Sequence, residues 1–319
     1  MQINDELKQE ILEKLSKSNS EYFKKSIYDD FLGIGYIDSN HKPTQKLIFL
    51  EFESFDLLIE HFYKEMNAYH NGFQIEYFKY PKKDPKKDPP NDLEETIKTE
   101  KNKFMQKFIK VYEIIRDEFG AKLQKYNEIY ICPYCEKNYI NIVKTDTKEL
   151  KPDLDHFYPK SLYPFLACSV ENLIPSCQMC NSRLKGNIDF HDKQHINPLK
   201  YRLFKDIKFS YDAKGIMIKN INELQQNENK KNYLNTFEIE KIYATHNEVL
   251  EEIQNKFKMY NSVKIRQIKE NCFALDEKEI LDIIFYEYKN ENKKNPLRKL
   301  KKDLYEKFNE YQQILAPNR

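Results

Sequence analysis

The chain has 319 residues, of which 40% are hydrophobic and 33% are charged, so it can bury a core and form roughly two or three domains. Its 53 Lys and Arg residues nearly balance its 51 Asp and Glu residues, and the net charge of +2 excludes a polycation that binds nucleic acid through its overall charge. No apolar stretch approaches the ~18 residues that cross a bilayer, and the first residues lack the basic-then-apolar layout of a signal peptide, so we expect a cytoplasmic protein without membrane contact.

The first part of the chain, residues 1–127, is predicted to be a helical region. Apolar residues recur every three or four positions in Glu6–Leu15 and in Phe55–Met66, which is the period of an amphipathic helix. The pattern of Gly33–Phe52 is ambiguous, and a short strand over Lys46–Phe52 is one interpretation of it. Residues 81–91 are rich in proline and lysine, which predicts a linker or an exposed loop because proline forbids a regular helix.

One long helix is predicted over Asp92–Tyr126. Its apolar residues form a stripe along one face, interrupted by Gly120. We attribute this stripe to core packing and assign it no function. Its members are Phe104, Phe108, Val111, Ile115, Phe119 and Leu123.

The last part of the chain, residues 201–319, is predicted to be mainly helical after one hairpin. Ile207–Ile218 alternates around Asp212–Gly215, which indicates two short strands joined by a turn. The helical period returns from Phe237 onward. The basic run Lys293–Lys302 is interpreted as a solvated helix face, with a strip that tracks phosphates as the alternative.

Four of the six cysteines form two Cys-x-x-Cys pairs, a spacing that indicates zinc in a protein that is not secreted. Each pair can hold one face of a tetrahedral ion, and four thiolates leave no open position for water, so we expect a structural Zn²⁺ site. A redox role would need a βαβ setting, which the sequence lacks. Cys168 and Cys272 are interpreted as small buried hydrophobic residues. The predicted ligands are Cys132, Cys135, Cys177 and Cys180.

The segment between the two cysteine pairs contains a second group of polar residues. Asp153 and Asp155 are separated by one apolar residue, as in a short strand, and His156 follows directly. A carboxylate beside a histidine places an oxygen ligand for a hard metal ion next to a candidate general base. Asn181 follows a cysteine of the predicted zinc site, so it would be held rigidly where a second oxygen ligand is needed.

This pattern resembles the HNH endonuclease motif. The resemblance rests on Asp155–Lys160, on Glu171–Pro175, and on the second cysteine pair with Asn181 and Lys185 after it, and it is specific over about Cys132–Lys185. It implies a ββα-metal fold, in which two strands and a helix surround one divalent ion. Weaker similarity to bacterial DHFxPKS-type HNH proteins continues at His195–Leu199, Ile242–His246 and Asn295–Lys301.

The resemblance implies specific roles for the motif residues. Asp155 and Asn181 would bind the catalytic metal ion, although many members have histidine at the second position. His156 would be the general base that takes a proton from the attacking water, and Asn172 would brace the loop that orients His156. Because Asp and Asn offer hard oxygen ligands, we expect Mg²⁺ or Mn²⁺. Asp153 would either orient water on the metal ion or be exposed.

Several other charged residues near the motif have two readings. His191 and His195 are interpreted as structural, with an approach to the active centre as the alternative. His246 is interpreted as a packed residue in the apolar stripe of a helix, without a catalytic role. Three cations would hold flanking phosphates, with a solvated surface charge as the alternative for each. These cations are Lys160, Arg183 and Lys185.

The expected fold is α+β and mostly α. A helical N-terminal region at 1–127 precedes a zinc-bound HNH nuclease domain at 128–200, and a mainly helical C-terminal region at 201–319 follows. The expected function is metal-dependent hydrolysis of phosphodiester bonds in nucleic acid, in DNA rather than RNA. The resemblance also implies a bacterial antiphage defence effector with an ATPase as a protein partner.

Two alternative functions remain open at the level of sequence. The first is a toxin that cleaves RNA, for example tRNA, with the same site, because DNA and RNA present the same diester. The second is a zinc-bearing module that binds nucleic acid without catalysis. The intact set of Asp155, His156, Asn172 and Asn181 argues against the second alternative.

Overall fold

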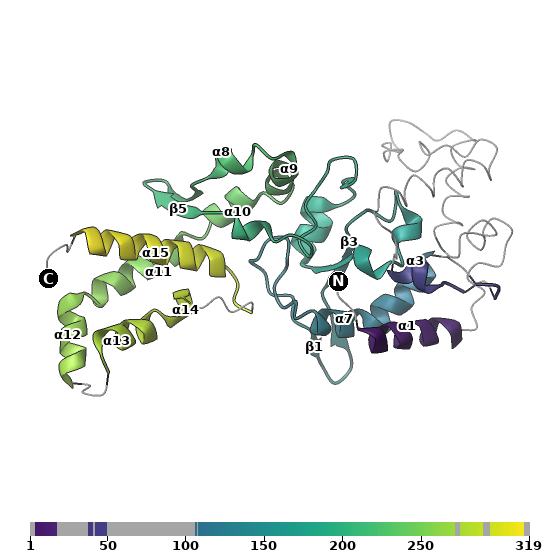
Figure 1. Cartoon of the computed structure of the whole chain (residues 1–319), viewed down its shortest axis with the longest axis horizontal. Helices are drawn as coiled ribbons and strands as arrows, with labels where there is room; N and C mark the ends of the chain where they lie inside the picture. Colours follow the sequence, from purple (N-terminus) through teal and green to yellow (C-terminus); the bar gives the residue numbers. More distant parts are fainter. Residues whose placement is uncertain are drawn as a thin grey trace. The chain divides into compact units, whose positions relative to one another are not determined.

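The computed structural model of the chain is mostly helical, with small antiparallel sheets, so the predicted α+β class with mostly α structure is confirmed (Figure 1). The predictions for Phe55–Met66, for the linker at 81–91 and for Cys272 lie outside the described residues. The structure describes residues 4–17, 38–40, 42–49, 106, 108–271, 275–289 and 294–315, without the side chains of 311–315.

The chain forms two compact units, each built from more than one segment. The first unit comprises Met1–Ile129, Asn141–Asn181 and Gly186–Lys193. The second unit comprises Tyr130–Ile140, Ser182–Lys185 and Gln194–Arg319. In the described part of both units, no helix is long and apolar enough to cross a bilayer.

The first unit begins with helix α1 (Asp5–Lys17), which confirms the helix predicted over Glu6–Leu15. Its buried residues recur at the four-residue spacing of one helical face, and Asn4 Oδ1 accepts a hydrogen bond from the Leu7 backbone N–H at 3.0 Å. The strand predicted at Lys46–Phe52 is wrong for its described part, because Gln45–Phe49 forms the short helix α3. A short apolar run does not distinguish a strand from a buried helical turn.

The long helix predicted before the cysteine segment is confirmed where it is described. Residues 108–114 are helical and continue through the π-helical turn η2 (Ile115–Phe119) into α7 (Gly120–Tyr126). A Cβ atom on Gly120 would lie 3.2 Å from Leu154 Cδ1, so the glycine allows the helix to approach the neighbouring strand closely. The described members of the predicted stripe are all buried, which confirms their role in the core: Phe108, Val111, Ile115, Phe119 and Leu123.

Two antiparallel strands follow in the first unit, and a helical turn comes after them in the chain. Strand β3 (Asp153–His156) pairs with β4 (Leu173–Ser176), with His156 opposite Leu173 and Asp153 opposite Ser176. The π-helical segment η5 (Met179–Lys185) comes directly after β4. The short elements around them are β1 (Val143–Lys144), β2 (Glu149–Leu150), η3 (Pro164–Leu166) and η4 (Val170–Asn172).

The second unit contains the predicted hairpin, formed by β5 (Phe209–Asp212) and β6 (Gly215–Ile218). Gly215 has a φ of +117°, and a Cβ atom there would lie 2.6 Å from Asn247 Oδ1, so the turn requires glycine. Helices fill the rest of this unit, as predicted: η6 (Leu203–Lys205), α8 (Ile221–Leu224), α9 (Glu228–Thr236), α10 (Ile239–Ala244), α11 (Asn247–Met259), α12 (Ser262–Asn271), α13 (Glu277–Ile284), α14 (Tyr286–Lys289) and α15 (Arg298–Leu315).

A buried carboxylate connects several segments of the second unit. Glu136 is 7% exposed, and its carboxylate pairs with the guanidinium groups of Arg202, at 2.8 Å, and Arg298, at 3.6 Å. Its backbone carbonyl accepts a hydrogen bond from Leu297 N–H at 2.9 Å. Arg298, the one arginine of the basic run 293–302, is therefore ion-paired inside the protein rather than solvated.

Replacing this carboxylate by a neutral amide is expected to destabilise the second unit. Glu136→Gln leaves two partly buried guanidinium groups without their counter-charge, which should lower the free energy of unfolding by about 1–3 kcal/mol. Urea unfolding measures this difference. Glu128→Gln is a matched control, because Glu128 is also at positive φ but is exposed, and it should change stability by less than about 0.5 kcal/mol. Equal stability of both variants would contradict the assigned role of Glu136.

Candidate metal centre and hydrolytic site

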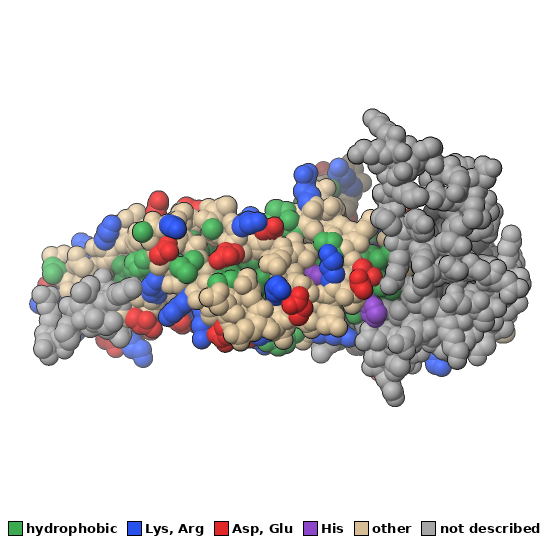
Figure 2. Space-filling view, turned by 90° about the horizontal axis from the view of Figure 1, so that it is seen from above, with side chains coloured by type: hydrophobic (Ala, Val, Ile, Leu, Met, Phe, Trp, Pro, Cys, Tyr) green, Lys and Arg blue, Asp and Glu red, His purple; other side chains and the backbone are tan. Residues whose placement is uncertain are grey.

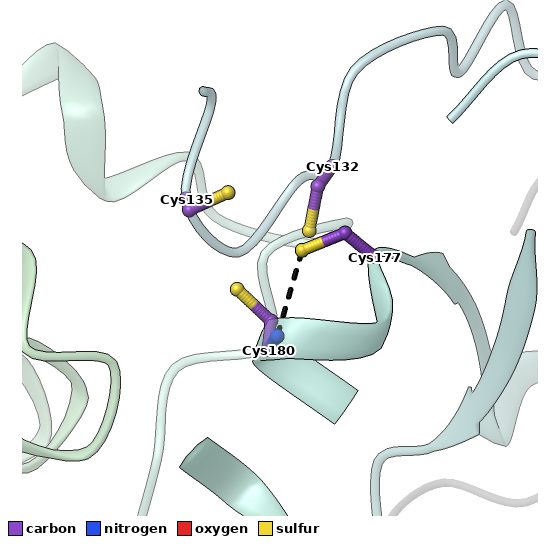
Figure 3. Close-up of side chains that lie close together, drawn as sticks. All are labelled: Cys132, Cys135, Cys177 and Cys180. Atoms are coloured by element: carbon purple, nitrogen blue, oxygen red, sulfur yellow. Dashed lines mark hydrogen bonds between the residues drawn. The ribbon is translucent and has the colours of Figure 1, made fainter. Parts of the chain in front are cut away.

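The four cysteines of the two Cys-x-x-Cys pairs lie together, as predicted. Their sulfur atoms are all within 4.8 Å of one another, and Figure 3 shows them facing a common centre. A tetrahedral ion with bonds of ~2.3 Å holds its sulfurs roughly 3.8 Å apart, so the cluster fits one zinc ion. Cys132, Cys135 and Cys180 are buried, and Cys177 is half-buried. The cluster can therefore hold a metal ion such as structural Zn²⁺.

Backbone hydrogen bonds shape the loop of the first cysteine pair. The Cys132 N–H donates to the Asn138 carbonyl at 2.9 Å, and the Glu136 N–H donates to the Cys132 carbonyl at 2.8 Å. Two buried tyrosines add to this: the Tyr233 hydroxyl donates to the Tyr134 carbonyl at 2.7 Å, and Tyr243 donates to the Cys135 carbonyl at 2.8 Å. The loop geometry is thus fixed by the protein itself.

Cys168 does not belong to this cluster. It is fully buried, as predicted, and burial raises the pKa of its thiol to about 12. A thiol with this pKa stays protonated at neutral pH, whereas a zinc ligand must be a thiolate. Cys168 is a packing residue.

His156 ends strand β3 and is buried. Its Nε2 atom lies 2.9 Å from the Ala167 carbonyl oxygen. A carbonyl only accepts hydrogen bonds, so Nε2 carries the proton, and in the neutral ring the lone pair is then on Nδ1. This tautomer is the one in which Nδ1 can accept a proton.

Asn172 is fully buried at the end of η4, and its side chain holds the loop that follows His156. Its Oδ1 atom accepts a hydrogen bond from the Tyr158 N–H at 2.8 Å. Its Nδ2 atom donates to the carbonyls of Tyr158 at 3.0 Å and Leu166 at 3.1 Å. Leu166 precedes Ala167, whose carbonyl contacts the imidazole, so Asn172 and His156 share one hydrogen-bonded loop.

Asn181 contacts Asp153 at the start of η5. Its Nδ2 atom lies 3.0 Å from the Asp153 carboxylate. Because a carboxylate accepts and does not donate, the amide nitrogen must face Asp153, which leaves Oδ1 as the ligand atom that Asn181 can offer. This contact lets Asp153 orient Asn181, and the reading in which Asp153 orients water on the metal ion stays a prediction.

The two faces of β3 separate the carboxylates from the imidazole. Successive strand residues point to opposite faces, so Asp155 shares a face with Asp153 and hence with Asn181, whereas His156 shares a face with Leu154. Asp155 is buried at 4% exposure. The donor set of Asp155 and Asn181 fits a hard divalent ion, whereas convergence of all three side chains on that ion stays a prediction.

Sequence reasoning missed Tyr112, which packs on the imidazole. The ring centroids of Tyr112 and His156 are 4.5 Å apart, and the ring planes meet at 57°. Tyr112 follows Phe108 by four residues, so it lies beside the buried stripe on the same helix. This position was the sequence signal that could have identified it as a buried residue. Lys160, one of the predicted phosphate-binding cations, places Nζ 5.0 Å from the centre of the same ring.

The other predicted cations lie in different environments. Arg183 is exposed, whereas Lys185 is only 2% exposed. A buried ammonium does not reach a phosphate at the surface, so this structure does not support the predicted phosphate contact of Lys185. A solvated surface charge, the alternative reading, is excluded for the same reason.

Among the described residues, the other histidines are His191, His195 and His246, and each has partners of its own. The His191 ring packs near those of Tyr158 and Tyr163, and His195 Nε2 lies 2.8 Å from Thr236 Oγ1. The placement of His246 in a helical stripe is wrong: α10 ends before it, and it precedes α11, where its Nδ1 atom lies 2.7 Å from the Glu248 carboxylate. The helical period alone did not reveal this break.

Comparison with known proteins gives one partial similarity. The chain is 36% identical over 85 residues to the Septu protein PtuB of Bacillus thuringiensis, a match that covers 26% of this chain and 30% of the relative. The chain thus spans less than a third of the relative it matches. No family model matches the chain, and no solved structure shows a significant match to it.

The cysteine cluster should bind one zinc ion per chain, and losing one thiolate should release it. Cys180→Ser is expected to lower the zinc content and the thermal stability together, because metal binding to such a site contributes to folding. Metal analysis of the purified protein measures the zinc content. Cys168→Ala is the matched control and should retain the metal. Full zinc content in Cys180→Ser would contradict the assignment.

Removing the Asn172 side chain should loosen the loop after β3. Asn172→Ala deletes three buried hydrogen bonds and leaves their backbone partners unsatisfied, so we expect a loss of about 2–4 kcal/mol in unfolding free energy with zinc retained. Amide hydrogen exchange at Tyr158 should become faster. Asn187→Ala, an exposed asparagine in the same unit, is the control. Unchanged exchange at Tyr158 would exclude the bracing role.

Proposed function

We propose that the protein is a metal-dependent endonuclease of the HNH type that hydrolyses phosphodiester bonds in DNA. The observation that carries this proposal is the hydrogen bond between His156 Nε2 and the Ala167 carbonyl, which favours the tautomer of a general base. The order of two antiparallel strands and a helical turn, β3–β4–η5, supports it, as does the resemblance of the motif residues to HNH enzymes.

His156 would supply the base. With Nε2 donating to Ala167, Nδ1 takes a proton from the attacking water. The carbonyl restrains the ring during this step, and the imidazolium that forms keeps its Nε2–H bond to the same oxygen. A positioned base of this kind contributes roughly 10²- to 10⁴-fold to the rate.

Asp155 and Asn181 would hold the catalytic ion. When bound, Mg²⁺ or Mn²⁺ supplies positive charge that stabilises the developing charge on the phosphate oxygens. Asp153 would orient Asn181 by accepting a hydrogen bond from its amide nitrogen, at 3.0 Å. Asn172 would keep the loop from Phe157 to Ala167 in place and so hold the Ala167 carbonyl against the base.

The distribution of charge indicates how the protein would contact nucleic acid. On the face shown in Figure 2, basic and acidic side chains of the described residues are interspersed. Because phosphate contacts supply most of the affinity for nucleic acid, binding would depend on local cations such as Lys160 and Arg183. We also propose that an ATPase partner, as the motif resemblance implies, contributes to substrate binding in a defence system against phage.

Cleavage of RNA remains the second candidate, since the motif is the same for both substrates. The third is a zinc-bearing module that binds without cutting. The joint presence of Asp155, His156, Asn172 and Asn181 favours catalysis over the third candidate.

A single substitution should abolish cutting. His156→Ala removes the base and is expected to lower kcat by roughly 10²- to 10⁴-fold, while the zinc content stays the same. Cleavage of plasmid DNA, single-stranded DNA and structured RNA with Mg²⁺ or Mn²⁺ measures the effect and identifies the substrate. His246→Ala is the matched control, since its ring lies near Glu248 in the second unit.

Two results would contradict the proposal. Equal cutting by wild type and His156→Ala would remove His156 as the base. A wild-type protein that binds DNA but cuts none of the three substrates would favour the binding module.

A further inference from the structure

The helix at 108–114 brings Tyr112 to the base, although it lies far from the motif in sequence. Tyr112 is 5% exposed, and its ring lies against His156 with 4.5 Å between ring centroids. Its hydroxyl donates to the Leu154 carbonyl at 3.4 Å, a long hydrogen bond to the backbone of β3. The tyrosine therefore contacts both the imidazole and the strand that carries it.

The imidazole contacts Tyr112 as well as Ala167. The hydrogen bond at Nε2 restrains one ring atom, and rotation about the Cβ–Cγ bond would move both ring nitrogens. The Tyr112 ring occupies one side of the imidazole and limits this motion by packing. Gly120 lets the helix pack closely against β3, since a Cβ atom on this residue would lie 3.2 Å from Leu154 Cδ1.

Two cations lie near the Tyr112 ring. Lys160 Nζ is 5.0 Å and Arg116 Cζ is 5.6 Å from the ring centroid, and Arg116 also pairs with the Asp117 carboxylate at 2.6 Å. Lys160 follows β3, and Arg116 follows Tyr112 on its helix by four residues. Cation–π contacts from both segments restrain the ring in one place.

Tyr112 does not compete with His156 as a base. Burial raises the pKa of its hydroxyl to about 12, so the group stays protonated at neutral pH. Its hydroxyl contacts a strand carbonyl rather than the imidazole nitrogens. Its effect on the reaction would be exerted through the orientation of His156.

We propose that Tyr112 is a positioning residue of the hydrolytic site, whose ring holds the imidazole plane of His156 so that Nδ1 faces the attacking water. This inference rests on the proposed nuclease function. It gives the helix at 108–114 a direct role in orienting His156, although this helix lies outside the motif that carries the family resemblance.

The test separates the ring from the hydroxyl. Tyr112→Phe keeps the ring and should retain kcat within about threefold, because only one long hydrogen bond is lost. Tyr112→Leu and Tyr112→Met remove the planar ring and should lower kcat by about 10- to 100-fold with KM unchanged, since small misplacement of a reacting group has effects of this size. Phe119→Leu is the matched control: it removes a buried ring from the same helix and should leave kcat unchanged.

A second measurement does not need activity. In protein labelled with ¹⁵N-histidine, the His156 ring nitrogens at one neutral pH should report the Nε2-protonated tautomer in wild type and Tyr112→Phe, and a mixture of tautomers in Tyr112→Leu or Tyr112→Met. The Met variant, with a volume closer to that of tyrosine, serves if the Leu variant does not fold.

The outcomes distinguish the two proposals. If wild type cuts DNA and the folded Leu or Met variant has wild-type kcat and wild-type ring signals, the positioning role is overturned. Equal losses of kcat in Phe119→Leu and Tyr112→Leu overturn it too, because they indicate general destabilisation. If wild type cuts no substrate, the nuclease proposal fails, and unchanged His156 ring signals in the variants would overturn the positioning role separately.

Discussion

The hydrogen bond between the His156 ring and the Ala167 carbonyl is the interaction on which the candidate site depends. It is local in space but not in sequence, because the carbonyl lies eleven residues after the histidine. The loop between them must therefore keep one shape, and the buried Asn172 side chain satisfies three backbone groups of that loop at once. Losing any of these three hydrogen bonds would leave a buried polar group unsatisfied, which costs free energy. The loop therefore has little freedom to adopt a second arrangement. The chemistry assigned to His156 thus follows from backbone geometry more than from the histidine alone.

The metal-binding residues have a comparable dependence on their surroundings. The cysteine cluster can hold an ion because the turn at the first pair is closed by its own backbone bonds and by two tyrosine hydroxyls. Asn181 lies one residue after the second pair, and its amide nitrogen is engaged by Asp153. In both cases hydrogen bonds position the candidate ligand residues before any ion is bound, and this pre-organisation lowers the entropy cost of binding.

Much of this arrangement could be predicted from the sequence, and the failures have physical causes. The cysteine spacing predicted the cluster because two residues between ligands suit one ion, and the Asp212–Gly215 turn predicted the hairpin because Gly215 requires positive φ. The strand expected at Lys46–Phe52 was wrong for its described part because its three consecutive buried residues, Leu47, Ile48 and Phe49, are too short a run to show the periodicity that separates helix from strand. His246 was placed in a helix because the break between α10 and α11 carries no proline or glycine. Tyr112 was missed because its contact with His156 joins residues 44 apart, and a single sequence gives no sign of such pairs.

The contact between Asp153 and Asn181 has a consequence for metal choice. Many HNH enzymes have histidine where this chain has Asn181, and a carboxylate in the position of Asp153 can accept a hydrogen bond from an imidazole N–H as readily as from an amide N–H. The same support would therefore orient either ligand, and exchanging the two would leave the scaffold unaltered. What would differ is the donor atom: an amide oxygen suits hard ions, whereas an imidazole nitrogen suits borderline ions such as Zn²⁺ and Ni²⁺. A one-residue exchange on an unchanged backbone would therefore change which cations the proposed site could bind.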